Sequence, residues 1–215
     1  MFSNYYFIVA FSAVFTIVNP LGAIGPFLSM TAGDPPDKKK STAMRACTLA
    51  TGVLLVCTGV GGFMFQFFGF TLPALKIAGG ILLFNVGIDM LNARESRSRA
   101  TEEEREEGTH KEDIAIFPLA IPLLSGPGAM VTVFILGERA KTTQEHAFVY
   151  LSVVATMVLS YLTLIQAHRL ARVLGATGMN VMARMMGLIL AAIAVQFVLD
   201  GLTNALPGLL GLHPS

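Results

Sequence analysis

Long apolar segments with few charges alternate with short charged clusters along the whole sequence. The apolar segments are residues 4–32, 46–68, 70–92, 114–137, 146–167 and 184–205. An α-helix needs about 20 mostly apolar residues to cross a bilayer. The pattern therefore predicts an all-α membrane protein with six transmembrane helices. These helices account for residues 1–215 as one transmembrane domain and leave no room for a soluble domain.

The composition agrees with this pattern. Of the 215 residues, 53% are hydrophobic and 13% are charged, whereas soluble domains are about 25% charged. A net charge of +1 without a basic face excludes a nucleic-acid binder. Lys76, Asp89 and Asp200 are the three charged residues that lie outside the charged clusters.

The basic residues of the connections predict the orientation of the chain. The connections after the first, third and fifth helices contain twelve Lys and Arg residues, and the opposite side contains three. Cytoplasmic connections carry the excess of Lys and Arg in membrane proteins. Both termini are therefore predicted to lie outside the cytoplasm.

An internal repeat is visible at an offset of 106 residues. This offset aligns Gly22 with Gly128 and Gly69 with Gly175. Because a unit of three helices that is repeated once must insert upside down the second time, the alignment predicts two inverted three-helix repeats.

The repeats divide the chain into three parts. Residues 1–92 form the first repeat and residues 114–215 the second. Residues 93–113 join them as a charged cytoplasmic linker without a hydrophobic face, which is typical of a solvated or partly helical segment. A partner-binding role for this linker is the alternative.

Helix-breaking residues lie near the middle of the first and fourth predicted helices. The residues at these two breaks are Asn19, Pro20, Leu21, Gly22, Ser125, Gly126, Pro127 and Gly128. Proline removes a backbone donor, glycine loosens the backbone, and asparagine or serine caps a helix start. We therefore expect helices 1 and 4 to be broken. The second half-helices should start at Pro20 and near Pro127, with Ser125 as a cap.

The two breaks predict a substrate-binding site in the middle of the membrane. Irregular backbone survives in hydrocarbon only where it is buried in protein or lines a watery cavity. A helix N-terminus carries about half a positive charge and free N–H donors. We expect these N–H groups to bind a carboxylate, and the unwound carbonyl groups and Asn19 to bind an ammonium group. A proline kink without a binding role is the alternative.

The charged residues inside the apolar segments have two interpretations. Asp89 and Asp200 lie near helix ends, and Arg94 follows Asp89 by five residues, so a helix-end anchor or ion pair is favoured. Coupling of transport to H⁺ or Na⁺ through these carboxylates is the alternative. Lys76 is expected to reach the membrane interface with its long side chain.

Other polar and small residues are expected to pack helices together. Asn85, Gln166 and Gln196 are predicted to form hydrogen bonds between helices, while Gly79, Gly80 and Gly187 should allow close helix approach. The four His residues lie in connections or at helix ends, and the sequence has neither a Cys/His metal motif nor a phosphate-binding loop. We predict neither an enzyme nor a cofactor.

At its breaks the sequence resembles the MarC family of bacterial integral membrane proteins, also called UPF0056. The matching segments are residues 19–22 with Pro26, 117–122, 126–128, 77–80, 186–188 and 200–201. The resemblance implies six helices in a bacterial inner membrane with both termini periplasmic. It also implies a transporter of small neutral amino acids such as glycine and alanine. It brings no residue-level mechanism.

These observations together predict a secondary transporter of small neutral amino acids. An efflux transporter of drugs or metabolites and an aquaporin-like passive channel are the alternatives, and a non-transporting membrane partner protein is a third class. Apart from the substrate, the expected partners are the lipid bilayer and a coupling ion. The oligomeric state stays open.

Overall fold

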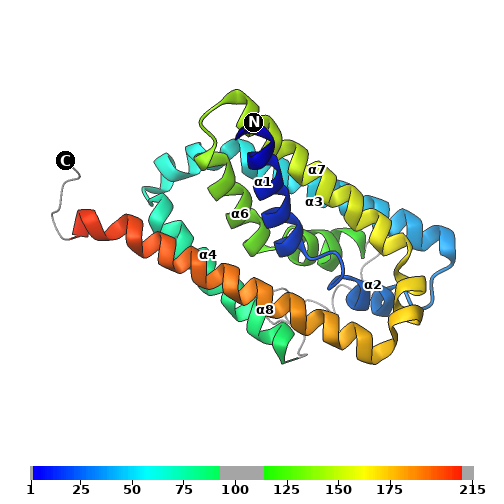
Figure 1. The fold of residues 1–215 in the computed structure, drawn as a ribbon. Helices are drawn as coiled ribbons and strands as arrows, with labels where there is room; N and C mark the ends of the chain where they lie inside the picture. Colours follow the sequence, from blue (N-terminus) through cyan, green and yellow to red (C-terminus); the bar gives the residue numbers. More distant parts are fainter. Residues whose placement is uncertain (1, 93–113, 210–215) are drawn as a thin grey trace.

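The computed structural model describes residues 2–92 and 114–209, which are helical and contain no strand. The predicted linker, residues 93–113, lies outside the described residues. The helices in chain order are α1 (Phe2–Val18), α2 (Ile24–Met30), α3 (Pro36–Phe68), α4 (Leu72–Leu91), η1 (Ala115–Leu124), α6 (Pro127–Arg139), α7 (Thr143–Ile165) and α8 (Ala167–Leu209) (Figure 1).

Four helical segments are long and apolar enough to cross a membrane. They are Pro36–Gly61, Leu72–Leu91, Thr143–Ile165 and Thr177–Leu206. Their outward faces expose large apolar side chains, such as Ile81, Val158 and Leu188, whose transfer from water into lipid is favourable. The chain is therefore an integral, multi-pass membrane protein.

The two remaining predicted segments are each divided into two helices. Segment 4–32 contains α1, an apolar helix of 17 residues, followed by the seven-residue α2. Segment 114–137 contains η1, whose ten residues form a π-helix, followed by the 13-residue α6. Neither segment is one continuous membrane helix.

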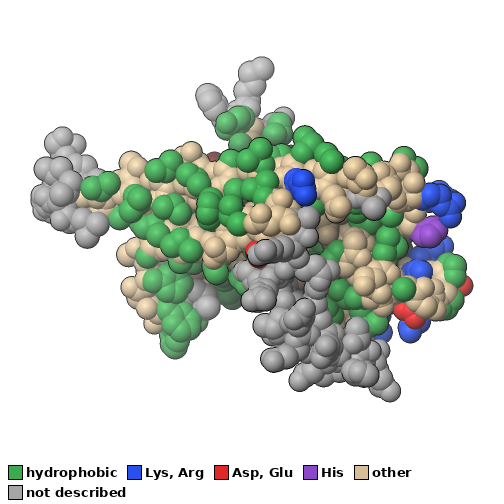
Figure 2. Space-filling view, turned by 90° about the horizontal axis from the view of Figure 1, so that it is seen from below, with side chains coloured by type: hydrophobic (Ala, Val, Ile, Leu, Met, Phe, Trp, Pro, Cys, Tyr) green, Lys and Arg blue, Asp and Glu red, His purple; other side chains and the backbone are tan. Residues whose placement is uncertain are grey.

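The basic residues gather at one end of the molecule. The first turns of α3 and α8 lie at the same end of the fold (Figure 1), and Figure 2 shows Lys and Arg side chains at the corresponding end. The basic residues in these turns include Lys38 to Lys40, Arg169 and Arg172. The start of α4 and the end of α8 lie toward the opposite end.

Helices α4 and α8 pack closely and run antiparallel. A Cβ atom at Gly80 would lie 2.7 Å from the carbonyl oxygen of Ala194, and one at Gly187 would lie 2.8 Å from that of Gly87. Side chains larger than hydrogen therefore do not fit between the two backbones. This confirms the packing role predicted for Gly80 and Gly187.

Helix boundaries recur at the offset found in the sequence. Helix α1 ends at Val18 and η1 ends at Leu124, which is 106 residues later. Helix α3 ends just before Gly69, whose φ is 68°, and α8 is interrupted at Gly175, whose φ is 64°. Both glycines adopt the left-handed conformation that residues with a Cβ atom disfavour.

The interior lies between α1, α3, α6, η1 and α7. Its largest fully buried side chains include Val14, Leu54, Leu119, Val133 and Leu164. Polar contacts fix α1 as well, since the Tyr6 hydroxyl donates to the carbonyl of Leu136 at 2.8 Å. Packing and this hydrogen bond thus hold the start of α1 beside the end of α6.

Candidate functional site

The first break is organised around Asn19. Helix α1 ends at Val18, and Asn19, which is 1% exposed, has a φ of 51°. Asparagine tolerates this left-handed conformation because its short side chain bonds locally. Here the Asn19 Oδ1 accepts a hydrogen bond from the Gly22 N–H at 3.1 Å.

The side chain of Asn19 also fixes its neighbours. Its Nδ2 donates to Met90 Sδ of α4 at 3.5 Å, so the amide lies between the break and α4. A Cβ atom at Gly22 would overlap the Asn19 amide nitrogen. Position 22 therefore needs glycine, because the Asn19 amide occupies the space that a Cβ atom would take.

The expected helix start at Pro20 is wrong. Residues 20–23 form a turn, and α2 starts only at Ile24. The Asn19 side chain accepts the Gly22 N–H, as an N-cap does, but the Ile24 N–H bonds to the Leu21 carbonyl at 3.2 Å, which is a tighter turn than an α-helix and delays the helix start. The first break is therefore a capped turn followed by a short helix.

The second break is a different structure at the corresponding place. The π-helix η1 leads to Ser125, whose N–H and hydroxyl both donate to the carbonyl of Ala120, each at 2.9 Å. Ser125 is fully buried. The prediction that Ser125 caps α6 is wrong, because its N–H and its hydroxyl group both bond to the preceding helix, η1.

Helix α6 starts at Pro127, as predicted, with an uncapped N-terminus. The position before it is Gly126, which has no side chain and forms no side-chain cap. The first N–H groups of a helix have no partner inside that helix. The N–H groups of Gly128 and Ala129 are therefore available for an anionic group, with the helix dipole in support.

These residues line a cavity where five helices meet. The lining residues are Ile17, Leu82, Leu83, Val86, Leu123, Gly126, Pro127, Gly128, Ala129 and Leu190. The cavity has a volume of about 20 Å³, which is enough for about one water molecule. Its side chains are aliphatic, so its polar character comes from the backbone at the start of α6.

The structure brings the two breaks close together, but of the predicted site residues only those of the second break line the cavity. A Cβ atom at Gly128 would overlap Leu83 and would lie 3.6 Å from Ile17, two residues before Asn19. Gly126, Pro127 and Gly128 line the cavity.

The remaining predicted site residues do not line this cavity. Asn19 and Ser125 are buried beside it, and the Asn19 amide bonds Met90 instead. Pro20, Leu21 and Gly22 belong to the turn that follows Asn19. The aliphatic wall from α4, including Leu83 and Val86, was not predicted, because apolar spacing alone does not distinguish a cavity wall from core or lipid contact.

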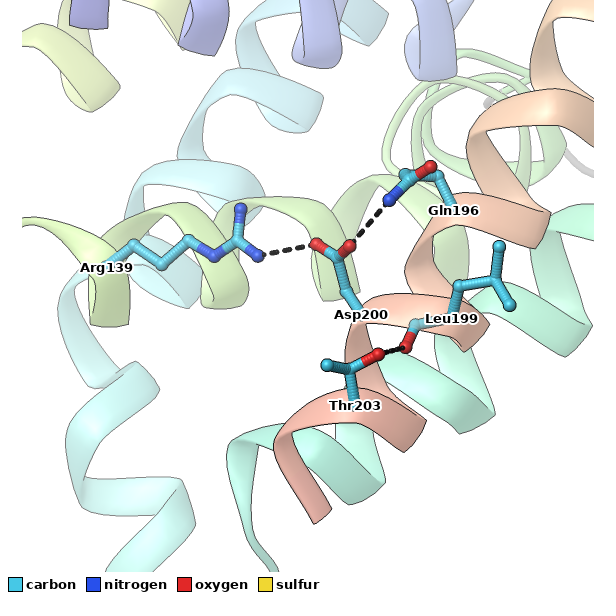
Figure 3. Close-up of polar contacts among 5 residues, drawn as sticks. All are labelled: Arg139, Gln196, Leu199, Asp200 and Thr203. Atoms are coloured by element: carbon cyan, nitrogen blue, oxygen red, sulfur yellow. Dashed lines mark hydrogen bonds and ion pairs between the residues drawn. The ribbon is translucent and has the colours of Figure 1, made fainter. Parts of the chain in front are cut away.

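A charged cluster lies at another place in the bundle. Arg139 at the end of α6 forms an ion pair with Asp200 of α8 at 3.0 Å, and Gln196 donates to the second oxygen of Asp200 at 2.7 Å (Figure 3). The ion pair favoured for Asp200 is therefore present. Its partner, Arg139, was not predicted because nothing in the sequence links positions 61 residues apart.

Two other charged residues behave differently. Lys76 is only 3% exposed, so the prediction that it extends to the membrane interface is wrong. Close packing of α4 on α8 encloses it. Asp89 is partly exposed, and Arg94, its expected partner, lies outside the described residues.

The polar side chains predicted to link helices do not do so. Gln196 bonds Asp200 and Gln166 bonds the Leu162 carbonyl, each within its own stretch of chain, and Asn85 faces outward. Within residues 2–92 and 114–209, no group of three or more His, Cys, Asp or Glu side chains is placed to hold a metal ion.

Comparison with known proteins identifies the family of this chain. Residues 4–206 match the profile that describes MarC family integral membrane proteins. This chain belongs to the MarC family. No solved structure matches it.

Several MarC relatives cover nearly its full length. A UPF0056 membrane protein of Methanocaldococcus jannaschii is 36% identical over 201 residues, 94% of this chain and 98% of that protein. YvbG of Bacillus subtilis is 34% identical, covering 96% of this chain and 98% of its own. YhcE of Escherichia coli is 32% identical, covering 93% of each chain. MarC relatives therefore occur in archaea and bacteria, and their names state membrane location only.

Proposed function

We propose that this MarC protein is a secondary transporter of small neutral amino acids. The observation that carries the proposal is the uncapped N-terminus of α6, which lines a small, partly open cavity between the helices of a membrane protein. Free N–H donors at this position suit a carboxylate, and an uncharged aliphatic wall suits a zwitterion with a small side chain.

We also propose the arrangement that such a site needs. Segments 4–32 and 114–137 cross the membrane as discontinuous helices, so the chain has six crossings in two inverted repeats. Matching helix ends at Val18 and Leu124 and matching left-handed glycines at 69 and 175 support this proposal. The basic end of the molecule is cytoplasmic, which places both termini in the periplasm of a bacterial inner membrane.

Substrate binding requires the cavity to widen. At about 20 Å³ it has room for a water molecule rather than an amino acid. Helices α6 and α4 approach closely at the cavity, because a Cβ atom at Gly128 would overlap Leu83 of α4. Movement of α6 against α4 would open the space, with the carboxylate on the α6 N–H groups and the ammonium near the carbonyl groups of residues 19–22.

Uptake into proteoliposomes tests the function. Purified protein is reconstituted, and uptake of labelled glycine or alanine is measured under an imposed H⁺ gradient, under a Na⁺ gradient and without a gradient. Saturable uptake driven by one gradient is expected and would identify the coupling ion, for which Asp89 and Asp200 are the candidate residues. Uptake that does not saturate would favour a passive channel. Outward movement of drugs would favour an efflux transporter.

A further inference from the structure

The last turn of α1 contains three carbonyl groups without a hydrogen-bond donor. The Asn19 N–H donates to the carbonyl of Phe15 at 2.9 Å, which closes the helix in a left-handed C-terminal turn. The next three carbonyl groups, those of Thr16, Ile17 and Val18, receive no hydrogen bond from any residue that the structure describes. Ile17 and Val18 are only 4% and 1% exposed. Because buried carbonyl groups are almost always paired, three unpaired ones in a row indicate a ligand.

The residues that follow α1 explain the missing donors. In a continuing α-helix, the N–H groups of residues 20–22 would donate to these three carbonyl groups. Pro20 has no N–H, and the Gly22 N–H donates instead to Oδ1 of Asn19 at 3.1 Å. The N–H groups of residues 23 and 24 bond within the turn that leads to α2. The unpaired carbonyl groups are therefore a consequence of the sequence at the break.

Three such oxygen atoms at a helix end favour a cation. The last carbonyl groups of an α-helix point beyond its C-terminus, which carries about half a negative charge. Backbone carbonyl groups accept hydrogen bonds but do not titrate, so the ion is a metal ion rather than H⁺. Divalent cations in proteins are held largely by carboxylates, whereas the carbonyl groups of unwound membrane helices bind Na⁺.

The end of α1 lies at the cavity already described. Ile17 is one of the residues that line this cavity, and a Cβ atom at Gly128 would lie 3.6 Å from Cγ2 of Ile17. Figure 1 shows the end of α1 beside the start of α6. The negative end of one helix therefore lies close to the positive end of another. A cation on α1 and a carboxylate on α6 would be direct neighbours.

We propose that the carbonyl groups of Thr16, Ile17 and Val18 bind Na⁺ as the coupling ion of transport. The substrate carboxylate on the α6 N–H groups, together with water in the cavity, supplies the remaining oxygen ligands of the ion. The confined space of about 20 Å³ favours Na⁺ over the larger K⁺. The substrate ammonium keeps its proposed place near the carbonyl groups of residues 19–22.

The Na⁺ site rests on the proposed function, because it supplies the coupling ion of that transport. It consists of backbone oxygen atoms rather than of the carboxylates of Asp89 or Asp200. Asp200 already forms an ion pair with Arg139, and neither carboxylate lines the cavity. Because Na⁺ and the substrate carboxylate attract each other, each tightens the binding of the other by the same factor.

Equilibrium binding of radioactive Na⁺ to the purified full-length protein tests the site. The decisive variant is Pro20→Ala, because its new N–H can donate to a carbonyl group in the last turn of α1 and so remove one ligand of the ion. We expect saturable Na⁺ binding that choline does not displace, and an affinity about tenfold lower in Pro20→Ala.

The matched control is Pro36→Ala at the exposed first position of α3. A new N–H at this position meets no carbonyl group of its own helix, so this variant should bind Na⁺ like the wild type. Thermal midpoints of both variants without Na⁺ show whether a loss of binding is a loss of folding.

Glycine binding by the wild type gives a second measurement that needs no variant. Saturating Na⁺ should tighten the binding of labelled glycine about tenfold, and saturating glycine should tighten Na⁺ binding by the same factor. Affinities that do not depend on each other overturn the proposed coupling.

The results distinguish the Na⁺ site from the proposed function. Absence of saturable Na⁺ binding, equal displacement by K⁺ and Na⁺, or unchanged Na⁺ affinity in a folded Pro20→Ala variant overturns the Na⁺ site. Glycine uptake that an H⁺ gradient drives without Na⁺ overturns only the Na⁺ site. Na⁺ binding that Pro20→Ala weakens, without any glycine uptake by the wild type, overturns only the proposed transport.

Discussion

Gly69 and Gly175, which lie 106 residues apart, have nearly the same left-handed backbone conformation, with φ angles of 68° and 64°. Each precedes a long membrane helix, α4 in one case and the main part of α8 in the other. The same turn thus sets the direction of the two helices that pack against each other in the structure.

Alanine at either glycine should destabilise the protein through backbone strain alone. A Cβ atom at Gly69 or Gly175 would contact nothing within 4 Å, so the cost is that of the left-handed conformation, about 1–2 kcal/mol. Free energies of unfolding from a denaturant titration in micelles check this. Gly52→Ala in α3 is the control, because it also meets open space in a helix and should stabilise by about 0.5–1 kcal/mol. Equal effects at all three positions would contradict the account.

Two substitutions should separate the conformational role of Asn19 from its hydrogen-bonding role. Asn19→Ala introduces left-handed strain and leaves the Gly22 N–H without its acceptor, which together should cost about 2–3 kcal/mol. Asn19→Gly keeps the conformation and loses only the hydrogen bonds, so it should cost about half as much. If Asn19→Gly is as damaging as Asn19→Ala when unfolding free energies are compared, the strain contribution is absent.

The α4–α8 contact should reject a methyl group at Gly187. A Cβ atom there would lie 2.8 Å from the Gly87 carbonyl oxygen and 2.8 Å from Met90 Cβ. Because backbone rather than a flexible side chain is in the way, Gly187→Ala should destabilise by about 1–3 kcal/mol. The same unfolding titration measures the effect, and a neutral result would show that the helices separate more easily than this packing implies.

A loss of uptake caused by Gly128→Ala should be reversed by a compensating change across the cavity. Gly128→Ala places a methyl group against Leu83, which should narrow the cavity and reduce glycine uptake by about tenfold, or 1.4 kcal/mol. Leu83→Ala removes the opposing methyl groups, so the double variant should recover uptake. Additive losses in uptake from the two changes would show that they do not share one cavity.

Both breaks are predictable from the sequence because proline, glycine and asparagine act on the backbone next to them. Pro127 starts α6 for this reason, and α1 ends at Val18. The conformation of the chain after each break depends on more distant contacts. The start of α2 depends on the tight turn in which the Ile24 N–H bonds to the Leu21 carbonyl, and the role of Ser125 depends on the wider turn of the preceding π-helix.

The charged cluster shows the same limit more strongly. Lys76 is near a helix start in the sequence, which is typical of an interfacial lysine, but the close approach of α8 buries it. The pairing of Arg139 with Asp200 depends on three helices meeting at one end. Tertiary packing determines these contacts, and the sequence pattern of a single helix does not reveal them.

Glycine uptake by reconstituted protein, measured against substrate concentration with and without ion gradients, tests the central claim most directly. The account predicts saturable uptake that one gradient drives, that unlabelled alanine inhibits, and that Gly128→Ala reduces. Absence of saturable uptake under every gradient, with protein that is folded and inserted, would contradict it.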